Sequence, residues 1–137
     1  MLIDAKDAIV GRIAAFAAKK ALLGENVNII NCEEAVITGD RKWVLAHYVH
    51  KMNRGSVASG PFFKRLPDRF FRRAVRGMLQ HRQERGATAY KKIKCYIGAP
   101  EKFKEQKAEI VPKSGVEKLP NTKFIKVKEL CLMLGGA

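Results

Sequence analysis

Short segments rich in β-branched residues alternate with longer segments of helical periodicity along most of the chain. The four predicted strands are residues 2–3, VNII (27–30), AVIT (35–38) and IKCYI (93–97). The segments between them carry apolar residues three or four positions apart, which is typical of helices. Strands separated by helices favour an α/β fold. We therefore predict a three-layer single domain with a mostly parallel four-stranded sheet and helices on both faces.

The predicted helices differ in their apolar faces. The first, GRIAAFAAKKALLGE (11–25), is rich in alanine, and its small side chains permit close approach to a sheet. The second, RKWVLAHYVHKM (41–52), is preceded by Asp40, a residue type that caps helices. Further helices are expected at 67–79, near 84–92 and near 123–134. A chain of 137 residues, of which 47% are hydrophobic, is long enough to bury one core, and no linker divides it.

Positive charge is concentrated in the middle of the chain. The formal net charge is +14, and the isoelectric point is about 10.0. Residues 41–94 hold 15 basic and 2 acidic residues, whereas residues 1–40 hold 4 basic and 6 acidic residues. So large an excess repels itself in a folded protein, and a polyanionic partner explains it best.

The helix predicted at 67–79 has two contrasting faces. An advance of about 100° per residue places the apolar residues on one half of the helix, and these are Phe70, Phe71, Ala74, Val75, Met78 and Leu79. Arg69, Arg72, Arg73 and Arg76 fall on the opposite half. Pro67 suits the first turn, and Asp68 beside it favours the positive end of the helix dipole. We interpret Phe70 and Phe71 as anchors to the core. The arginines are interpreted as phosphate ligands, because a guanidinium group binds phosphate through two parallel hydrogen bonds.

The loop before this helix, RGSVASGP (54–61), consists mainly of small residues. Gly55 and Gly60 allow its backbone to approach a phosphate chain closely, so we predict that the loop threads between nucleic-acid strands. Phe62 and Phe63 follow the loop. The sequence leaves open whether these two rings anchor the loop or stack on bases.

Basic residues beyond the helix extend the same surface, namely His81, Arg82, Arg85, Lys91, Lys92 and Lys94. No helix shows the spacing of base-reading side chains that follows a tight turn in DNA-binding proteins, and no dimer signature is present. The surface therefore fits the recognition of folded RNA by its shape. We expect no homo-oligomer.

Catalytic function finds no support in the sequence. A metal-dependent phosphoryl-transfer site needs clustered carboxylates, whereas the basic region holds only Asp68 and Glu84. His47 and His50 lie one helical turn apart but lack a third ligand nearby. No glycine-rich nucleotide-binding motif is present. We predict that the protein is not an enzyme and uses no metal or cofactor.

A membrane location finds equally little support. A basic amphipathic helix also suits a membrane surface, but this one lies in mid-chain, where a folded domain would bury its apolar side. The longest apolar run, residues 13–18, is too short to span a bilayer, and the N-terminus carries acids where a signal peptide carries bases. Cys32, Cys95 and Cys131 are far apart and odd in number, which is typical of a reducing compartment. These features predict a cytoplasmic protein that does not bind membranes.

Several motifs taken together resemble one known family. They are GRIAAFAAKKALLGENVNIINCE, the TGDR turn, RGSVASGP, RLPDRFFRRAVRGML and RGATAYKKIKCYIGAP, in this order between about residues 4 and 98. The chain resembles the universal large-subunit ribosomal protein family called "L thirteen", in its archaeal and eukaryotic branch. The resemblance implies an α/β fold and a structural role in which the protein binds large-subunit ribosomal RNA and supports subunit assembly. It also implies neighbouring large-subunit ribosomal proteins as partners and a place in the large subunit in the cytoplasm.

The resemblance transfers a set of RNA-facing residues to this chain. The family's loop and helix correspond here to Arg54, Gly55, Gly60, Lys64, Arg65, Arg69, Arg72, Arg73 and Arg76, and the basic stretch after the helix corresponds to His81, Arg82 and Arg85. Lys91, Lys92 and Lys94 rest on the charge pattern alone.

The chain also departs from the family pattern. Gln80 stands where the family usually has proline, so the helix is expected to run on or to turn differently there. The long basic C-terminal extension of eukaryotic members is missing, and the match is weak from Phe103 onward. Within a single domain of residues 1–137, we predict that residues 53–94 bind RNA and that residues 99–137 form a peripheral tail with a C-terminal helix. The alternative function is that of a free-standing RNA-binding or translational regulatory protein.

Overall fold

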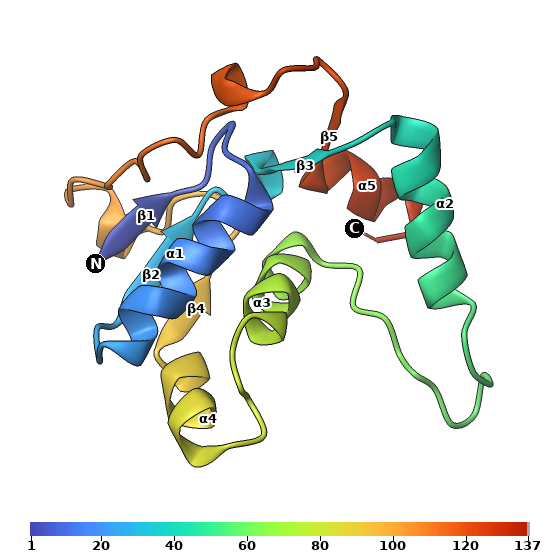
Figure 1. Ribbon diagram of the computed structural model, residues 1–137, viewed down its shortest axis with the longest axis horizontal. Coiled ribbons are helices and arrows are strands. Elements are labelled where there is room, and N and C mark those ends of the chain that lie inside the picture. The colour runs from blue at the N-terminus through green and yellow to red at the C-terminus, as the bar shows by residue number, and fades with distance from the viewer. Residues whose placement is uncertain (137) are drawn as a thin grey trace.

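Three short parallel strands form the main sheet of the protein. The computed structural model describes residues 1–136, and Figure 1 shows how their helices and strands are arranged. Strands β1 (Leu2–Asp4), β2 (Val27–Ile30) and β4 (Ile93–Cys95) lie side by side in the order β1-β2-β4. The central strand places Ile29 opposite Ile3 on one side and opposite Cys95 on the other. Ile3, Ile29 and Ile93 are fully buried, as expected of a parallel sheet whose faces are covered.

The strand predicted at residues 35–38 does not join this sheet. Strand β3 (Val36–Thr38) pairs in antiparallel fashion with β5 (Phe124–Lys126), so the parallel sheet formed by the described residues has three strands and not the four predicted. Asn31 adopts a left-handed backbone conformation, and a turn of 3₁₀ helix, η1 (Cys32–Glu34), follows it. These residues direct the chain away from the sheet before β3 begins. The free edge of β3 is then available to a segment almost ninety positions later, which no local pattern reveals.

Helix α1 (Val10–Leu22) is the alanine-rich helix predicted from the sequence. Ile13, Ala14, Ala17, Ala18 and Ala21 are buried along one face. This face packs against α3 (Pro67–Gly77) and α4 (Glu84–Lys91) as well as against the strands. The small side chains therefore bring α1 close to two helices in addition to the sheet.

Helix α2 (Arg41–Met52) has the predicted bounds but only a shallow apolar face. Asp40 lies at the position before the helix, yet its side chain makes no capping hydrogen bond, and its backbone carbonyl accepts one from the Val44 N–H at 2.9 Å. Val44 is buried, whereas Leu45, Tyr48, Val49 and Met52 of the apolar stripe are half-buried. In Figure 1, α2 lies at the right, away from the parallel sheet, and the loop after it returns over a long distance to α3.

The C-terminal part of the chain contributes to the core. The helix predicted near 123–134 is in fact strand β5 followed by helix α5 (Val127–Met133). Ile125, Val127, Leu130 and Cys131 are fully buried in this part. Earlier in the tail, the backbone of Glu109 hydrogen bonds to the outer edge of β1, and two turns of 3₁₀ helix, η2 (Glu101–Phe103) and η3 (Val116–Lys118), connect the extended segments.

The segment around Gln80 forms a tight turn. Helix α3 ends at Gly77, and the chain turns before α4 begins at Glu84, so the helix does not run on beyond the position where the family usually has proline. The Gln83 N–H donates to the Gln80 carbonyl at 3.0 Å. Gly86 is buried directly against this carbonyl, and a methyl group at Gly86 would overlap it. The absence of a side chain at residue 86 therefore allows α4 to pack against the turn.

Candidate nucleic-acid interface

Helix α3 carries the strongest candidate site, and its two faces are those that the sequence predicts. Phe70 is 6% exposed, Phe71, Val75 and Leu79 are also buried, and Pro67 occupies the first turn beside Asp68. The prediction that Phe70 and Phe71 anchor the helix is confirmed. Met78 differs, because α3 ends one residue earlier and the Met78 side chain is 45% exposed.

The arginines of α3 point away from the core. Arg69, Arg73 and Arg76 are exposed, and Arg72 is half-buried. Two of them rest on aromatic rings, since the Arg72 guanidinium lies 4.5 Å from the centre of the Tyr90 ring and the Arg73 guanidinium lies 5.3 Å from that of Phe63. Such cation–π contacts hold a guanidinium group in place while leaving its charge uncompensated. None of the four arginines forms an ion pair with a carboxylate within residues 1–136.

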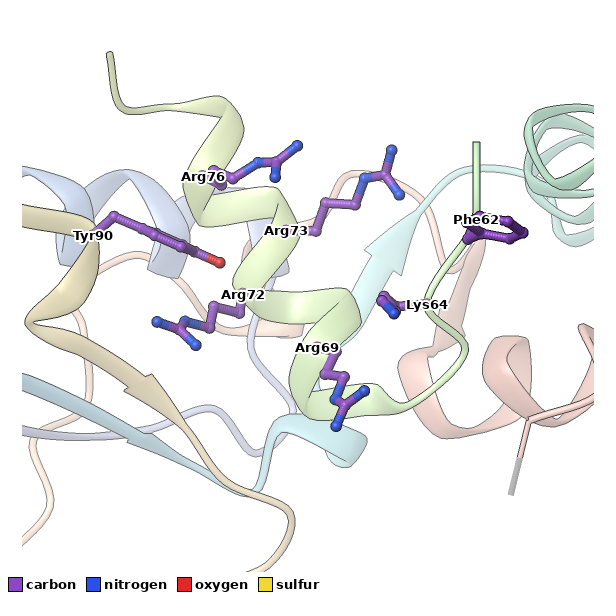
Figure 2. A pocket seen from close by; sticks show the side chains of 7 residues that line it. All are labelled: Phe62, Lys64, Arg69, Arg72, Arg73, Arg76 and Tyr90. Atoms are coloured by element: carbon purple, nitrogen blue, oxygen red, sulfur yellow. The ribbon is translucent and has the colours of Figure 1, made fainter. Parts of the chain in front are cut away.

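These arginines line a surface hollow of about 550 Å³, which we term the arginine hollow. Its lining residues are Phe62, Lys64, Arg69, Arg72, Arg73, Arg76 and Tyr90. Figure 2 shows that the arginines project from successive turns of α3, with Tyr90 of α4 on one side of them and Phe62 on the other. The hollow therefore combines five cations with two aromatic rings and contains no acid.

A second hollow of about 330 Å³ continues the cationic surface toward β4. Lys91 and Lys94 line it together with Arg69 and Arg72, which also line the arginine hollow. Asp68 lies in this second hollow as well, and it is the sole acid there. The structure thus brings two of the three lysines predicted after the helix, Lys91 and Lys94, beside the predicted arginines.

The loop before α3 is exposed and folds back on itself. The Ser56 N–H donates to the Gly60 carbonyl at 3.2 Å, and the Gly60 N–H donates to the Ser56 carbonyl at 2.9 Å. Gly55 has a φ of 84°, and a methyl group there would overlap the Gly60 carbonyl, so both the backbone conformation and the space require glycine. Arg54 and Arg65 line a further hollow of about 470 Å³ formed by this loop. Arg65 also donates a long hydrogen bond of 3.5 Å to the Gly135 carbonyl.

The other predicted residues lie outside the arginine hollow. His81 and Arg82 are exposed on the turn between α3 and α4, and Arg85 lies on α4 at a hollow shared with the end of α1. Lys92 is half-buried, and its ammonium group donates to the Gly24 carbonyl at 3.0 Å. This hydrogen bond connects the end of α4 to the turn after α1. Lys92 therefore has a structural contact, unlike His81, Arg82 and Arg85.

Sequence reasoning missed the aromatic residues that complete the site. Tyr90 holds Arg72, and Tyr96 lines the second hollow and packs against Phe103, with ring centres 5.4 Å apart. A tyrosine directly before two lysines is the available signal for Tyr90. The structure also separates the two loop phenylalanines. Phe63 packs against Tyr48 and Phe70, whereas Phe62 is 66% exposed.

The carboxylates of the N-terminal part have structural partners. Lys126 binds Glu34 at 2.5 Å and Asp7 at 3.3 Å, and the hydrogen bond to Glu34 is the main reason that the pKa of Lys126 is raised. Glu33 accepts from the Gly98 N–H at 2.9 Å, and Asp4 accepts from the Asn31 side chain at the same distance. These contacts give the carboxylates of the N-terminal part structural roles.

The thiols are not arranged as reactive groups. Cys32 and Cys131 are fully buried, and Cys95 is half-buried. Burial raises the pKa of Cys131 to about 11. A hydrogen bond with Cys95, together with burial, raises the pKa of Cys32 well above its ordinary value. Buried thiols that stay protonated at neutral pH are poor nucleophiles.

Within residues 1–136, no group of three or more histidine, cysteine or acidic side chains is placed so that it could hold a metal ion. No helix in this part of the chain has the length and apolar character needed to cross a membrane.

Comparison with known proteins gives one consistent result. The family model described as ribosomal protein L13 matches residues 1–102. The large ribosomal subunit protein uL13 of Archaeoglobus fulgidus is 39% identical over 98% of this chain and 86% of its own length. The proteins of the same name from Methanopyrus kandleri and Haloarcula marismortui are 38% and 35% identical, over 98% and 99% of this chain and 86% and 91% of their own lengths.

The extent of these matches decides the family. The archaeal relatives match nearly the whole chain, including the tail after Phe103, where motifs alone gave only a weak resemblance. They also agree with the predicted archaeal and eukaryotic branch. The chain therefore belongs to the ribosomal protein L13 family.

Proposed function

We propose that this protein is a structural constituent of the large ribosomal subunit, where it binds ribosomal RNA and supports assembly of the subunit. One observation carries the proposal. The arginines of α3 are held outward by a buried apolar face, line one hollow, and have no carboxylate partner within residues 1–136. Phosphate groups of RNA supply the missing negative charge. No catalytic step belongs to this function.

The mechanism is electrostatic. Each cation that meets a phosphate releases counterions from the RNA, and this release drives binding, so the logarithm of the affinity falls linearly with the logarithm of the salt concentration. The core side of α3 fixes the positions of its arginines, and contacts of Arg72 with Tyr90 and of Arg73 with Phe63 restrict two guanidinium groups further. Less conformational freedom is then lost when RNA binds.

We assign the RNA contacts to three groups of residues. The first is the arginine hollow with Lys64, Arg69, Arg72, Arg73 and Arg76, which Lys91 and Lys94 extend across the second hollow. The second is the loop with Arg54, Gly55, Gly60 and Arg65. The third is the margin formed by His81, Arg82, Arg85 and Lys92, of which Lys92 also binds the Gly24 carbonyl. Glycine is required at residue 55 by the close approach of its backbone to the Gly60 carbonyl within the loop, and we expect this exposed loop to lie against an RNA backbone.

The proposal includes the organisation of the chain. Residues 1–137 act as one domain in which helices cover both faces of the sheet in three layers. Residues 53–94 form its RNA-binding part. The tail that begins at residue 99 is available to neighbouring large-subunit proteins, while β5 and α5 anchor its end in the core. We place the protein in the cytoplasm, within the large subunit, without a membrane or a second copy of itself as partner.

Sedimentation of cell extract tests the proposal. Extract is separated on a density gradient under conditions that keep the ribosomal subunits apart, and the protein is detected by an antibody. We expect nearly all of it in the large-subunit peak. Treatment with ribonuclease before sedimentation is the control and should shift the protein to lighter fractions. Recovery of most of the protein in light fractions without ribonuclease would favour a free-standing RNA-binding or regulatory protein.

A further inference from the structure

Phe62 is the exposed aromatic residue of the RNA-binding part. The side chain is 66% exposed, whereas the rings around it are engaged. Phe63 and Phe70 pack against each other and against Tyr48, and Tyr90 is covered by Arg72. Within residues 1–136, the Phe62 ring has neither an aromatic partner nor a cation over its face.

The Phe62 ring lies at a defined place. A methyl group at Gly60 would lie 3.1 Å from the ring, so the ring rests closely against the glycine backbone. Phe62 also lines both the arginine hollow and the loop hollow. In Figure 2, Phe62 lies on the side of the arginine row that is opposite Tyr90. An apolar surface therefore borders a cationic hollow, and backbone packing fixes its position.

The chemistry of these two surfaces identifies a ligand. Cations bind phosphate, and an aromatic face stacks on a nucleobase, so a nucleotide needs both. In a paired RNA helix the bases are stacked inside and cannot reach a side chain, whereas unpaired bases can turn outward. A volume of about 550 Å³ lies within the range of about 300–1,000 Å³ that is usual for small-ligand pockets. An apolar protein segment would be a poor occupant, because it would leave five cations without partners.

We propose that the arginine hollow binds one unpaired nucleotide of RNA, with its base stacked on Phe62 and its phosphate held by Lys64 and the arginines of α3. The inference rests on the proposed function and makes it more specific. Phosphate contacts alone do not distinguish paired from unpaired RNA at this site, whereas a base stacked on Phe62 does.

Two RNA hairpins that differ in one nucleotide test the inference. One hairpin is fully paired, and the other carries a single bulged adenosine in the same stem. We expect the wild-type protein to bind the bulged hairpin about ten-fold more tightly, which is a typical contribution of one stacked base. Phe62→Ala should abolish this preference, and Phe62→Tyr should keep it. The salt dependence of Phe62→Ala binding should equal that of the wild type, because no phosphate contact is removed.

Two control variants separate stacking from other roles. Ile110→Ala changes an 80% exposed apolar residue of the tail, outside the cationic hollows and the loop hollow, and should alter the affinity for neither hairpin. Phe62→Leu keeps an apolar side chain without an aromatic face and should lose the preference. Retention of the preference by Phe62→Leu would overturn the stacking role.

The possible failures are distinguishable from one another. Equal affinity of the wild-type protein for the two hairpins, with a steep salt dependence, would overturn this inference and leave the proposed function intact. Equal loss of affinity for both hairpins in Phe62→Ala would also overturn it, since Phe62 would then only shape the loop. Salt-independent binding, or none, by the wild-type protein would refute the proposed function itself.

Discussion

Removal of three positive charges from α3 gives the sharpest test of the RNA-binding surface. The variant carries Arg72→Gln, Arg73→Gln and Arg76→Gln. Glutamine keeps much of the length and polarity of arginine but cannot pair with phosphate as a cation. Arg73 and Arg76 are exposed, and Arg72 lies on Tyr90, so none of the three changes removes core packing. The expected loss of stability is confined to two cation–π contacts, Arg72 with Tyr90 and Arg73 with Phe63, at about 0.5–1 kcal/mol each.

The magnitude of the effect follows from the number of contacts. Each phosphate contact contributes about 0.7–0.9 to the slope of log affinity against log salt, so loss of three contacts should flatten the slope by about 2–3. Between about 50 and 200 mM salt, the affinity of the wild type should then fall about 20- to 40-fold more than that of the variant. Filter binding of large-subunit ribosomal RNA across this range of salt measures both quantities.

A matched variant controls for net charge. Lys107, Lys118 and Lys123 are exposed on the tail and line neither cationic hollow, so their replacement by glutamine removes the same charge elsewhere. We expect this variant to keep the slope of the wild type. Thermal melts should show both variants folded. If the arginine variant keeps the slope of the wild type, or if the lysine variant loses as much, the assignment of α3 to phosphate contacts is refuted.

Four further substitutions test the stability of the fold. Phe70→Ala should lower the free energy of unfolding by about 3–5 kcal/mol, because a buried ring leaves a cavity, and a denaturant titration showing a loss below 1 kcal/mol would contradict this. Gly86→Ala should lower the stability by about 1–3 kcal/mol because its methyl group meets the Gln80 carbonyl. Gly77→Ala should raise the stability by about 0.5–1 kcal/mol, because residue 77 has helical backbone and open space around it. Thermal shifts of the same sign for Gly86→Ala and Gly77→Ala would refute this reasoning. Folding raises the pKa of Cys131 from 9.0 to about 11. The protonated thiol therefore contributes fully to the free energy of unfolding below pH 9, and this contribution is lost as the pH rises to about 11, at up to about 1.4 kcal/mol per pH unit. Unfolding titrations over this range should show a shallower decline in Cys131→Ala, and identical declines would count against the buried thiol.

Much of the candidate site could be predicted because it depends on one helix. The period of 3.6 residues sets which side chains share a face, so the buried positions of Phe70 and Phe71 and the outward arginines follow from their order in the chain. Tyr90 and Lys94 could not be placed beside Arg72 in the same way. Their positions depend on how the chain turns after Gly77 and returns along β4, and this packing is not a local property.

The sequence by itself determined the class of fold, the amphipathic character of α3 and the excess of positive charge in the middle of the chain. These properties depend on neighbouring residues and on composition, which every segment carries with it. Only the tertiary structure decided that β3 pairs with β5 and that Phe62 stays exposed while Phe63 is packed. The pairing of a strand edge and the covering of a ring depend on segments distant in the chain. The free energy of these long-range contacts is gained only when the whole chain has folded.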